Sequence, residues 1–245
     1  MRTSIALVAF LALLQSLVAQ GIRVHADGSK SSNSGTMTFL DLVIPGRTAI
    51  DHERAKRQGK LDTSYSFSAT DIQYIVDEHN RLRRRVPATD MLLMSWDRNL
   101  AASAQAHADK CIFAHSTNRF NTGENIYASP FSNYQNGFKM WFDEVYDQNC
   151  GCTNFYKHCC GHFTQVAWAA TSRVGCGFAK CNTILYARFQ RYILVCHYSP
   201  AGNVIYFSNG QMVARPGFTY KAQGELACSG CAPGYKCDDG LCTWS

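Results

Sequence analysis

Twelve cysteines in 245 residues constrain this chain more than any other feature of its sequence. Such a large and even number of thiols is typical of a secreted protein whose cysteines pair as disulfides. Apolar residues make up 46% of the chain and charged residues only 17%. A packed core is therefore possible, and a wholly disordered chain is excluded. We expect a disulfide-rich domain that folds outside the cytoplasm.

The N-terminal segment is predicted to be removed before the mature protein forms. A basic start, a short apolar run and the small residue Ala19 indicate a signal peptide over residues 1–19, cleaved after Ala19. Residues 20–57 hold no cysteine and end in RAKR, which resembles a proprotein cleavage site after Arg57. The apolar run is too short to span a membrane. We therefore expect a propeptide over residues 20–57 and a secreted, extracellular protein without a membrane span.

Three segments of the predicted mature chain have the apolar periodicity of helices. Apolar residues recur three and four positions apart over residues 71–86, 95–111 and 133–147. Ser68 and Thr70 are candidate N-caps of the first of these helices.

Later segments are rich in aromatic and β-branched residues with a period of two, which predicts strands over residues 162–168, 174–178 and 184–198. Helices in the first half and strands in the second predict an α+β domain with helices packed on an antiparallel sheet. The tail from Gly217 has four cysteines among glycines and prolines, which predicts a small disulfide-stapled module.

The formal net charge of +6 does not indicate a nucleic-acid-binding protein. Part of this charge lies in the predicted propeptide. The one dense basic run of the mature chain, residues 83–85, lies at the end of the first predicted helix, where cations complement the helix dipole. We expect these arginines to form a solvated helix end and expect no nucleic-acid partner.

Two long motifs resemble the signatures of the CAP superfamily, which comprises cysteine-rich secretory proteins, antigen 5 and pathogenesis-related proteins. Residues 161–171 (GHFTQVAWAAT) resemble the first signature and residues 193–204 (ILVCHYSPAGNV) the second. The resemblance covers residues 68–205, the core of a CAP domain that we place at residues 58–216. The cysteine spacing of residues 217–245 resembles the hinge module of the cysteine-rich secretory branch.

The resemblance implies a three-layer α-β-α sandwich with a small disulfide-stapled C-terminal hinge. It is nearest to the cysteine-rich secretory and glioma pathogenesis-related branches. The larger ion-channel-regulating module that follows the hinge in some venom and epididymal members does not appear in this sequence, so channel blockade is not carried over with the family.

Four residues, His115, Glu124, Glu144 and His162, match the histidines and glutamates of the family's central cleft. Two neutral imidazoles suit Zn²⁺ or another divalent metal, and the two carboxylates can orient the imidazoles or a bound water. With only two protein ligands we expect a weak site that releases its metal as imidazoles protonate, at about pH 6.5. The alternative is a buried His/Glu network that only holds the cleft together.

An alternative interpretation is a hydrolase that uses the same four residues as catalytic groups. A His and a Glu would activate a metal-bound water, or Ser116, Ser129 or Ser132 would act as the nucleophile of an endopeptidase. The sequence has neither Gly-x-Ser-x-Gly nor His-Glu-x-x-His. Enzymatic activity is therefore the less favoured interpretation.

Two other groups of residues are expected to be structural. Isolated histidines are usually satisfied core groups, and we expect this of His79, His107, His158 and His197. An aromatic stripe lies beside the place where some family members bind sterols or fatty acids, and we predict core packing rather than a lipid pocket for Phe131, Tyr134, Phe138, Trp141 and Phe142.

We expect every cysteine to be bridged. The resemblance to the hinge module implies the pairs Cys228–Cys237 and Cys231–Cys242, and a secreted protein disfavours the alternative of four zinc thiolates. Spacing does not determine how the other eight pair: Cys111, Cys150, Cys152, Cys159, Cys160, Cys176, Cys181 and Cys196.

These observations predict a secreted CAP-domain protein that acts as an extracellular binding or signalling module. Its partner would be an extracellular protein receptor or channel, or a small lipid such as a sterol or fatty acid. The alternatives are a secreted endopeptidase and a venom or salivary toxin that acts on ion channels.

Overall fold

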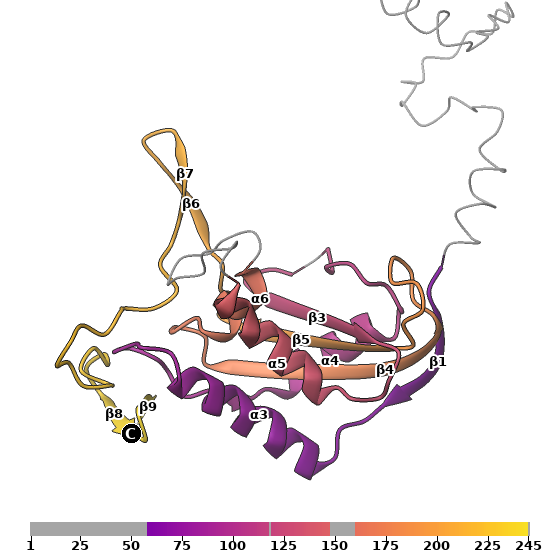
Figure 1. Cartoon of the computed structure of the whole chain (residues 1–245), viewed down its shortest axis with the longest axis horizontal. Coiled ribbons are helices and arrows are strands. Elements are labelled where there is room, and N and C mark those ends of the chain that lie inside the picture. The colour runs from indigo at the N-terminus through magenta and orange to yellow at the C-terminus, as the bar shows by residue number, and fades with distance from the viewer. Residues whose placement is uncertain (1–57, 118, 148–159, 245) are drawn as a thin grey trace, which may run out of the picture. The chain divides into compact units, whose positions relative to one another are not determined.

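The computed structural model describes residues 58–117, 119–147 and 160–244 (Figure 1). Several sequence predictions fall outside these residues: the signal peptide, the propeptide, the processing sites Ala19 and Arg57, His158, and the cysteines Cys150, Cys152 and Cys159. None of the helices in the described part of the chain is long and apolar enough to cross a membrane.

A five-stranded sheet forms the middle of the domain. Its strands are β1 (Lys60–Tyr65), β2 (Ser95–Trp96), β3 (Gly123–Ser129), β4 (Arg173–Thr183) and β5 (Tyr192–Ser199). The order β1-β4-β5-β3 is antiparallel throughout, and the short β2 pairs with β4 in parallel. The edge strand β1 was not predicted, because its residues are exposed along the whole strand and show no apolar periodicity.

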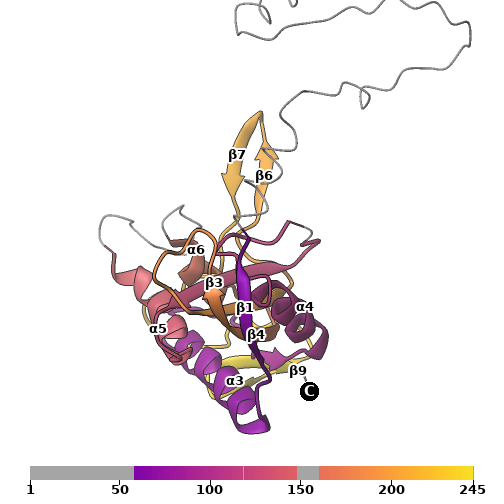
Figure 2. The ribbon, with the colours of Figure 1, turned by 90° about the vertical axis from the view of Figure 1, so that its right-hand side faces the viewer.

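Helices cover both faces of this sheet (Figure 2). The helices on one face are α3 (Ala69–Arg84), α5 (Gln135–Asp143), its 3-10 extension η1 (Glu144–Tyr146) and α6 (Gly161–Val166). On the other face lies α4 (Arg98–Ala108). The three-layer α-β-α sandwich that the resemblance implied is therefore confirmed.

The two faces of the sheet have separate hydrophobic cores. Phe138 and Leu194 belong to the larger core on the α3 side, and Ala104 and Val195 to the smaller core on the α4 side. The α4 side is close-packed because β4 presents glycine there. A Cβ on Gly177 would lie 2.3 Å from the backbone of Gln105, so no larger residue fits between helix and strand.

The first two helices begin where polar side chains cap them. Ser68 forms a capping box with Asp71 at the start of α3, as one of the two candidate caps predicted. The second helix begins at Arg98 and not near Ser95, because the Asp97 carboxylate accepts hydrogen bonds from the first backbone N–H groups of α4.

The prediction of a strand over residues 162–168 is wrong, since this segment forms α6. Four consecutive residues of this helix are buried. The alternation of apolar and polar residues in its sequence therefore does not correspond to a buried and an exposed face of a strand. The helix has no cap of its own: Glu144 accepts from the backbone N–H groups of His162 and Phe163, both at 3.0 Å. A carboxylate distant in sequence thus satisfies the helix N-terminus.

The predicted strand over residues 184–198 is too long. The chain leaves the sheet after β4, and Tyr186 and Phe189 adopt positive φ angles of 67° before β5 begins at Tyr192. Side-chain hydrophobicity alone does not reveal such a turn.

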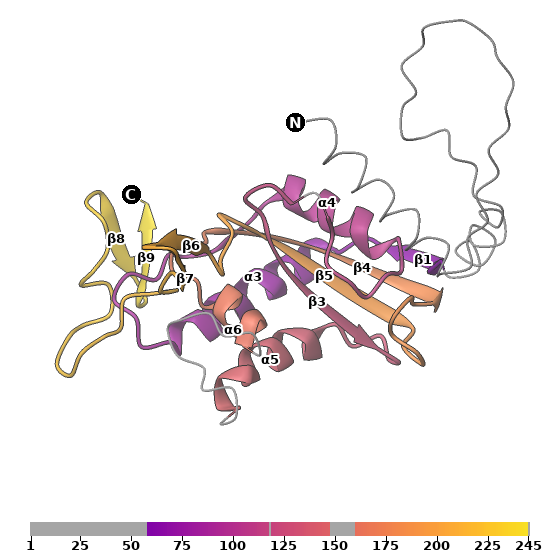
Figure 3. The same cartoon turned by 90° about the horizontal axis from the view of Figure 1, so that it is seen from above.

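Two hairpins follow the sheet, β6 (Ile205–Ser208) with β7 (Gln211–Ala214), and β8 (Tyr235–Asp238) with β9 (Leu241–Trp244) (Figure 3). The terminal module docks on the loop after α3, since the Leu93 N–H donates to the Cys242 carbonyl and the Cys242 N–H to the Met91 carbonyl. Leu241 is fully buried in the larger core. The module is therefore continuous with the packing of the domain.

The disulfides tie these parts together. The terminal module contains Cys228–Cys237 and Cys231–Cys242, the same two pairs that the resemblance implied. In the domain, Cys176–Cys196 joins directly opposed residues of β4 and β5, and Cys111–Cys181 joins the chain after α4 to β4. Cys160 is also bridged, and the described residues include no free cysteine.

Arg83 is completely buried, so the expected solvated helix end is wrong for this residue. Its guanidinium donates to carbonyl oxygens of the loop after α3, of the last residue of α6 and of the loop after α6, at distances of 2.7–3.2 Å. These acceptors belong to Leu92, Val166, Trp168, Ala169 and Thr171. Burial lowers the pKa of Arg83 to about 9, which still leaves it protonated at neutral pH. One buried cation therefore fastens the end of α3 to the loop after α6.

We predict that Arg83→Lys lowers the free energy of unfolding by about 2 to 4 kcal/mol, because an ammonium group lacks the planar fork of donors that these carbonyls need. The matched control is Arg84→Lys, since Arg84 is partly exposed and its side chain pairs with Asp239. It should change stability by about 0.5 kcal/mol or less. Urea denaturation at pH 7 measures both, and equal effects of the two variants would contradict the role assigned to Arg83.

Candidate functional site

The candidate site is built around the carboxylate of Glu124, which is fully buried on β3. Its Oε1 accepts from His115 Nδ1 at 2.7 Å and from the Ser116 backbone N–H at 2.9 Å. Its Oε2 accepts from the Ser116 hydroxyl at 2.7 Å and from His197 Nε2 at 3.0 Å. Arg119 Nε lies 3.5 Å from Oε1. Both oxygens are thus occupied by donors.

These donors keep Glu124 ionised. Burial by itself would raise the pKa of Glu124, but hydrogen bonds from His115, His197 and Ser116 outweigh burial and hold that pKa well below its usual value of 4.5. Because an ionised carboxylate only accepts hydrogen bonds, His115 Nδ1 must carry a proton. In the neutral ring of His115 the lone pair is then on Nε2.

A second His/Glu pair lies on the other face of the sheet. Glu144, in η1, accepts from His162 Nδ1 at 2.6 Å as well as from the backbone at the start of α6. The ring of His162 lies parallel to that of Trp141, with 6.3 Å between the ring centroids. The same argument leaves the lone pair of neutral His162 on Nε2.

Both pairs line one cleft of about 730 Å³ at the start of β3. His115 reaches it from the α4 side and His162 from the α6 side. The two sides approach closely because β3 begins with Gly123, where a Cβ would lie 1.9 Å from the Gln165 side chain. The structure therefore brings together all four residues that the sequence proposed, His115, Glu124, Glu144 and His162, as two hydrogen-bonded pairs around one cavity.

The candidate metal ligands of this cleft are the imidazoles of His115 and His162. Within the described ranges, the one group of three candidate ligand atoms close enough to share an ion is the sulfurs of Cys228, Cys231 and Cys242. These sulfurs belong to disulfides and are not thiolates. A tightly closed metal site of three or more clustered ligands is thus not formed by the described residues of the cleft.

Sequence reasoning missed His197, which was expected to be an isolated structural histidine. It lies directly opposite Glu124 in the pairing of β3 with β5, so the two side chains share a face of the sheet. His197 Nδ1 in turn lies 2.7 Å from the Ser103 hydroxyl of α4. The second signature contains His197 but does not indicate its contact with Glu124, because the register of β3 with β5 cannot be read from the sequence.

The other two described histidines have different surroundings. His79 is fully buried, with Nδ1 2.7 Å from the Ile75 carbonyl and Nε2 3.0 Å from the Tyr198 hydroxyl. His107 Nε2 lies 2.8 Å from the Ala114 carbonyl, and its buried Nδ1 has no hydrogen-bond partner among the described residues. His79 is therefore a satisfied core group, whereas His107 retains an unused acceptor.

The three serines of the hydrolase sketch are not paired with an imidazole in the described residues. The Ser116 hydroxyl donates to Glu124. Ser129 is buried, and its oxygen accepts from the backbone of Phe131. Ser132 is exposed. Among the described residues, Ser103 does contact an imidazole, that of His197.

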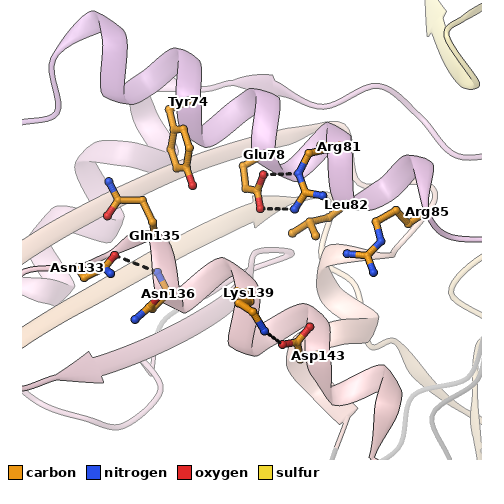
Figure 4. A pocket seen from close by; sticks show the side chains of 10 residues that line it. All are labelled: Tyr74, Glu78, Arg81, Leu82, Arg85, Asn133, Gln135, Asn136, Lys139 and Asp143. Atoms are coloured by element: carbon orange, nitrogen blue, oxygen red, sulfur yellow. Dashed lines mark hydrogen bonds and ion pairs between the residues drawn. The ribbon is translucent and has the colours of Figure 1, made fainter.

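The aromatic stripe is core, with one exception. Tyr134, Phe138, Trp141 and Phe142 are buried, whereas 73% of Phe131 is exposed. The groove of about 410 Å³ between α3 and α5 has mainly polar walls with the ion pairs Glu78–Arg81 and Lys139–Asp143 (Figure 4). An alkyl chain would desolvate these charges, so the groove does not suit a lipid tail.

Comparison with known proteins gives a consistent result. The sequence model of the cysteine-rich secretory protein family, CAP, matches residues 76–198. Protein lon-1 of Caenorhabditis elegans is 49% identical over 228 residues, which are 86% of this chain and 72% of that protein. Human peptidase inhibitor 15 is 32% identical, over 94% of this chain and 92% of that protein.

A solved structure described as NaASP2 with Zn²⁺ has a similar fold. The TM-score is 0.58 and the sequence identity 27%, with 72% of this chain and 96% of that chain covered.

We predict that Glu124→Gln lowers the free energy of unfolding at pH 7 by about 1 to 3 kcal/mol, because the amide cannot accept all the hydrogen bonds of the carboxylate. The folded-state pKa of Glu124 is depressed, so its stabilisation is complete above the usual value of 4.5 and is lost as the pH falls below it. The stability difference between wild type and Glu124→Gln should therefore shrink between pH 5 and pH 3.

Urea denaturation in a chelating buffer across this pH range tests the prediction. The control is Glu225→Gln, which changes an exposed glutamate in the terminal module. It should differ little from wild type at every pH. A Glu124→Gln difference that is constant from pH 7 to pH 3 would refute the assignment of Glu124 as a buried anion.

Proposed function

Because this chain belongs to the cysteine-rich secretory protein (CAP) family, we propose that it is a secreted extracellular binding module whose cleft holds a divalent metal ion, such as Zn²⁺, between His115 and His162. The proposed partner is an extracellular protein that contacts the rim of the cleft.

The observation that carries the proposal is the matched orientation of the two imidazoles. Glu124 and Glu144 each bind the Nδ1–H of one histidine, which leaves each Nε2 as a potential ligand atom. Carboxylate–histidine pairs of this kind fix the tautomer and increase the basicity of a metal-ligating imidazole. Two hydrogen-bonded pairs lining one cavity are therefore suited to hold a borderline-soft divalent cation.

The similar structure described with Zn²⁺ supports the choice of metal. Two imidazole ligands leave coordination positions of a zinc ion open, so we expect modest affinity. A metal bound here would act as a Lewis acid that accepts a carboxylate or imidazole of the partner. The protein's own contribution is to orient His115 and His162 through Glu124 and Glu144.

A protein partner is favoured over a lipid by the surface beside the cleft. Ile205 lines the cleft and begins β6, where Ile205, Tyr206 and Phe207 are 48%, 46% and 76% exposed. Exposed aromatic and aliphatic side chains next to a polar cavity are typical of a protein-binding surface. The polar groove between α3 and α5 offers no comparable apolar cavity for a lipid.

Several observations support secretion. The described part of the chain has disulfides in the domain and in the terminal module, which persist in oxidising compartments. The matching family is described as secretory.

We predict that Glu144→Gln weakens Zn²⁺ binding by about 10- to 100-fold, because the orienting carboxylate of His162 is lost. Isothermal titration of the secreted protein with Zn²⁺ at pH 7.5 measures the effect. His115→Ala combined with His162→Ala should abolish binding in the cleft.

The matched control is Asp143→Asn, which removes the neighbouring carboxylate. Asp143 pairs with Lys139 in the α3–α5 groove and does not line the cleft. It should leave Zn²⁺ affinity within a factor of two. If wild type binds no Zn²⁺, or if the double histidine variant binds it unchanged, the proposed metal site does not exist.

A further inference from the structure

A second cavity lies behind the metal cleft, on the α4 side of Glu124. Its volume is about 390 Å³, and it shares only Arg119 and Thr122 with the cleft. Helix α4 contributes Ser103, Ala106 and His107 to its lining, and Lys110 follows just beyond the end of the helix. Ser103 and His107 are four positions apart, so they lie on one face of the helix.

Three side chains form a continuous hydrogen-bonded series into this second cavity. The Ser103 oxygen lies 2.7 Å from His197 Nδ1, and His197 Nε2 lies 3.0 Å from Glu124 Oε2. Ser103 is exposed, whereas His197 and the Glu124 carboxylate are buried. A hydroxyl at the surface is thus joined to an imidazole that a buried carboxylate holds in place.

The proton positions in this series follow from the carboxylate. Glu124 only accepts, so His197 Nε2 carries the proton. In neutral His197 the lone pair is on Nδ1 and faces the Ser103 hydroxyl. Ser103 also lies 2.9 Å from the Leu100 carbonyl, so its proton has two acceptors, of which His197 Nδ1 is the nearer. His197 is therefore positioned to act as a base towards Ser103.

The geometry points to an acyl-transfer site in which Ser103 is the nucleophile, His197 the general base and Glu124 the orienting carboxylate. A hydroxyl, an imidazole and a buried carboxylate in this order are the three parts of a serine-hydrolase triad. Ser103 and His197 lie outside the metal cleft, and the site shares with it only the supporting carboxylate of Glu124.

The lining of the cavity defines the class of substrate. Lys110 and Arg119 add positive charge, which suits an anionic substrate. His107 also lines the cavity. The volume fits a small molecule. The substrate is therefore a small carboxylic ester that carries a negative charge.

The reaction needs only the ester and water. The Ser103 oxygen attacks the carbonyl carbon while its proton passes to His197 Nδ1. The bond from the carbonyl carbon to the leaving oxygen then breaks, and the alcohol departs with that proton. Water attacks the acyl group and gives a proton to His197 Nδ1; the bond to Ser103 then breaks, and Ser103 regains the proton. The products are one carboxylic acid and one alcohol.

A fluorophosphonate probe tests the triad without knowledge of the natural ester. The secreted protein is treated with the probe in a chelating buffer at pH 7.5, and the labelled residue is mapped by peptide mass spectrometry. We expect one adduct, on Ser103. Ser103→Ala should abolish it, and this exposed helix position should tolerate alanine without loss of folding. His197→Gln should slow labelling by about 100-fold or more.

The matched control is Ser95→Ala, because Ser95 is also exposed and its hydroxyl contacts the backbone carbonyl of Ser172. It should be labelled at the wild-type rate. The triad would be overturned by absence of an adduct on Ser103, or by equal labelling of wild type and a folded His197→Gln. Ser103 would then serve only as a hydrogen-bond partner of a buried imidazole.

Discussion

The buried carboxylate of Glu124 is the constraint on which this end of the molecule depends. An ionised group without water costs several kcal/mol unless every lone pair is satisfied. Here the loop after α4 supplies His115 and Ser116, and the register of β3 with β5 supplies His197. The loop, the sheet register and the helix α4 are thus held in one arrangement by a single anion.

Arg83 is a second buried charge, at the end of α3, and its hydrogen-bonding groups must likewise be satisfied inside the protein. Its donors are satisfied by backbone carbonyls of loops instead of by carboxylates. One of those loops also carries Met91 and Leu93, on which the terminal module docks through Cys242. The position of the disulfide-stapled module therefore depends indirectly on a cation in the core, and its disulfides alone do not place it.

The cleft and the cavity behind it share Glu124 as a common support. The carboxylate orients His115 towards the cleft with one oxygen and His197 towards Ser103 with the other. A change in the charge on either imidazole alters the field at the same carboxylate. The proposed metal site and the proposed acyl-transfer site therefore share one supporting residue, Glu124.

Local periodicity predicts the helix α3, with Ser68 as one of two candidate caps, and the aromatic face of α5. The family resemblance implies the four cleft residues and the hinge disulfides. These features depend on local periodicity or on motifs of fixed spacing. Tertiary structure alone decided that α6 is a helix, because its N-terminus is capped by Glu144, 18 residues earlier. It also decided that Arg83 is buried and that His197 meets Glu124. Periodicity predicts which side chains are buried. The hydrogen-bond partners that stabilise a buried polar group, however, come from distant parts of the chain, and only the tertiary structure brings them together.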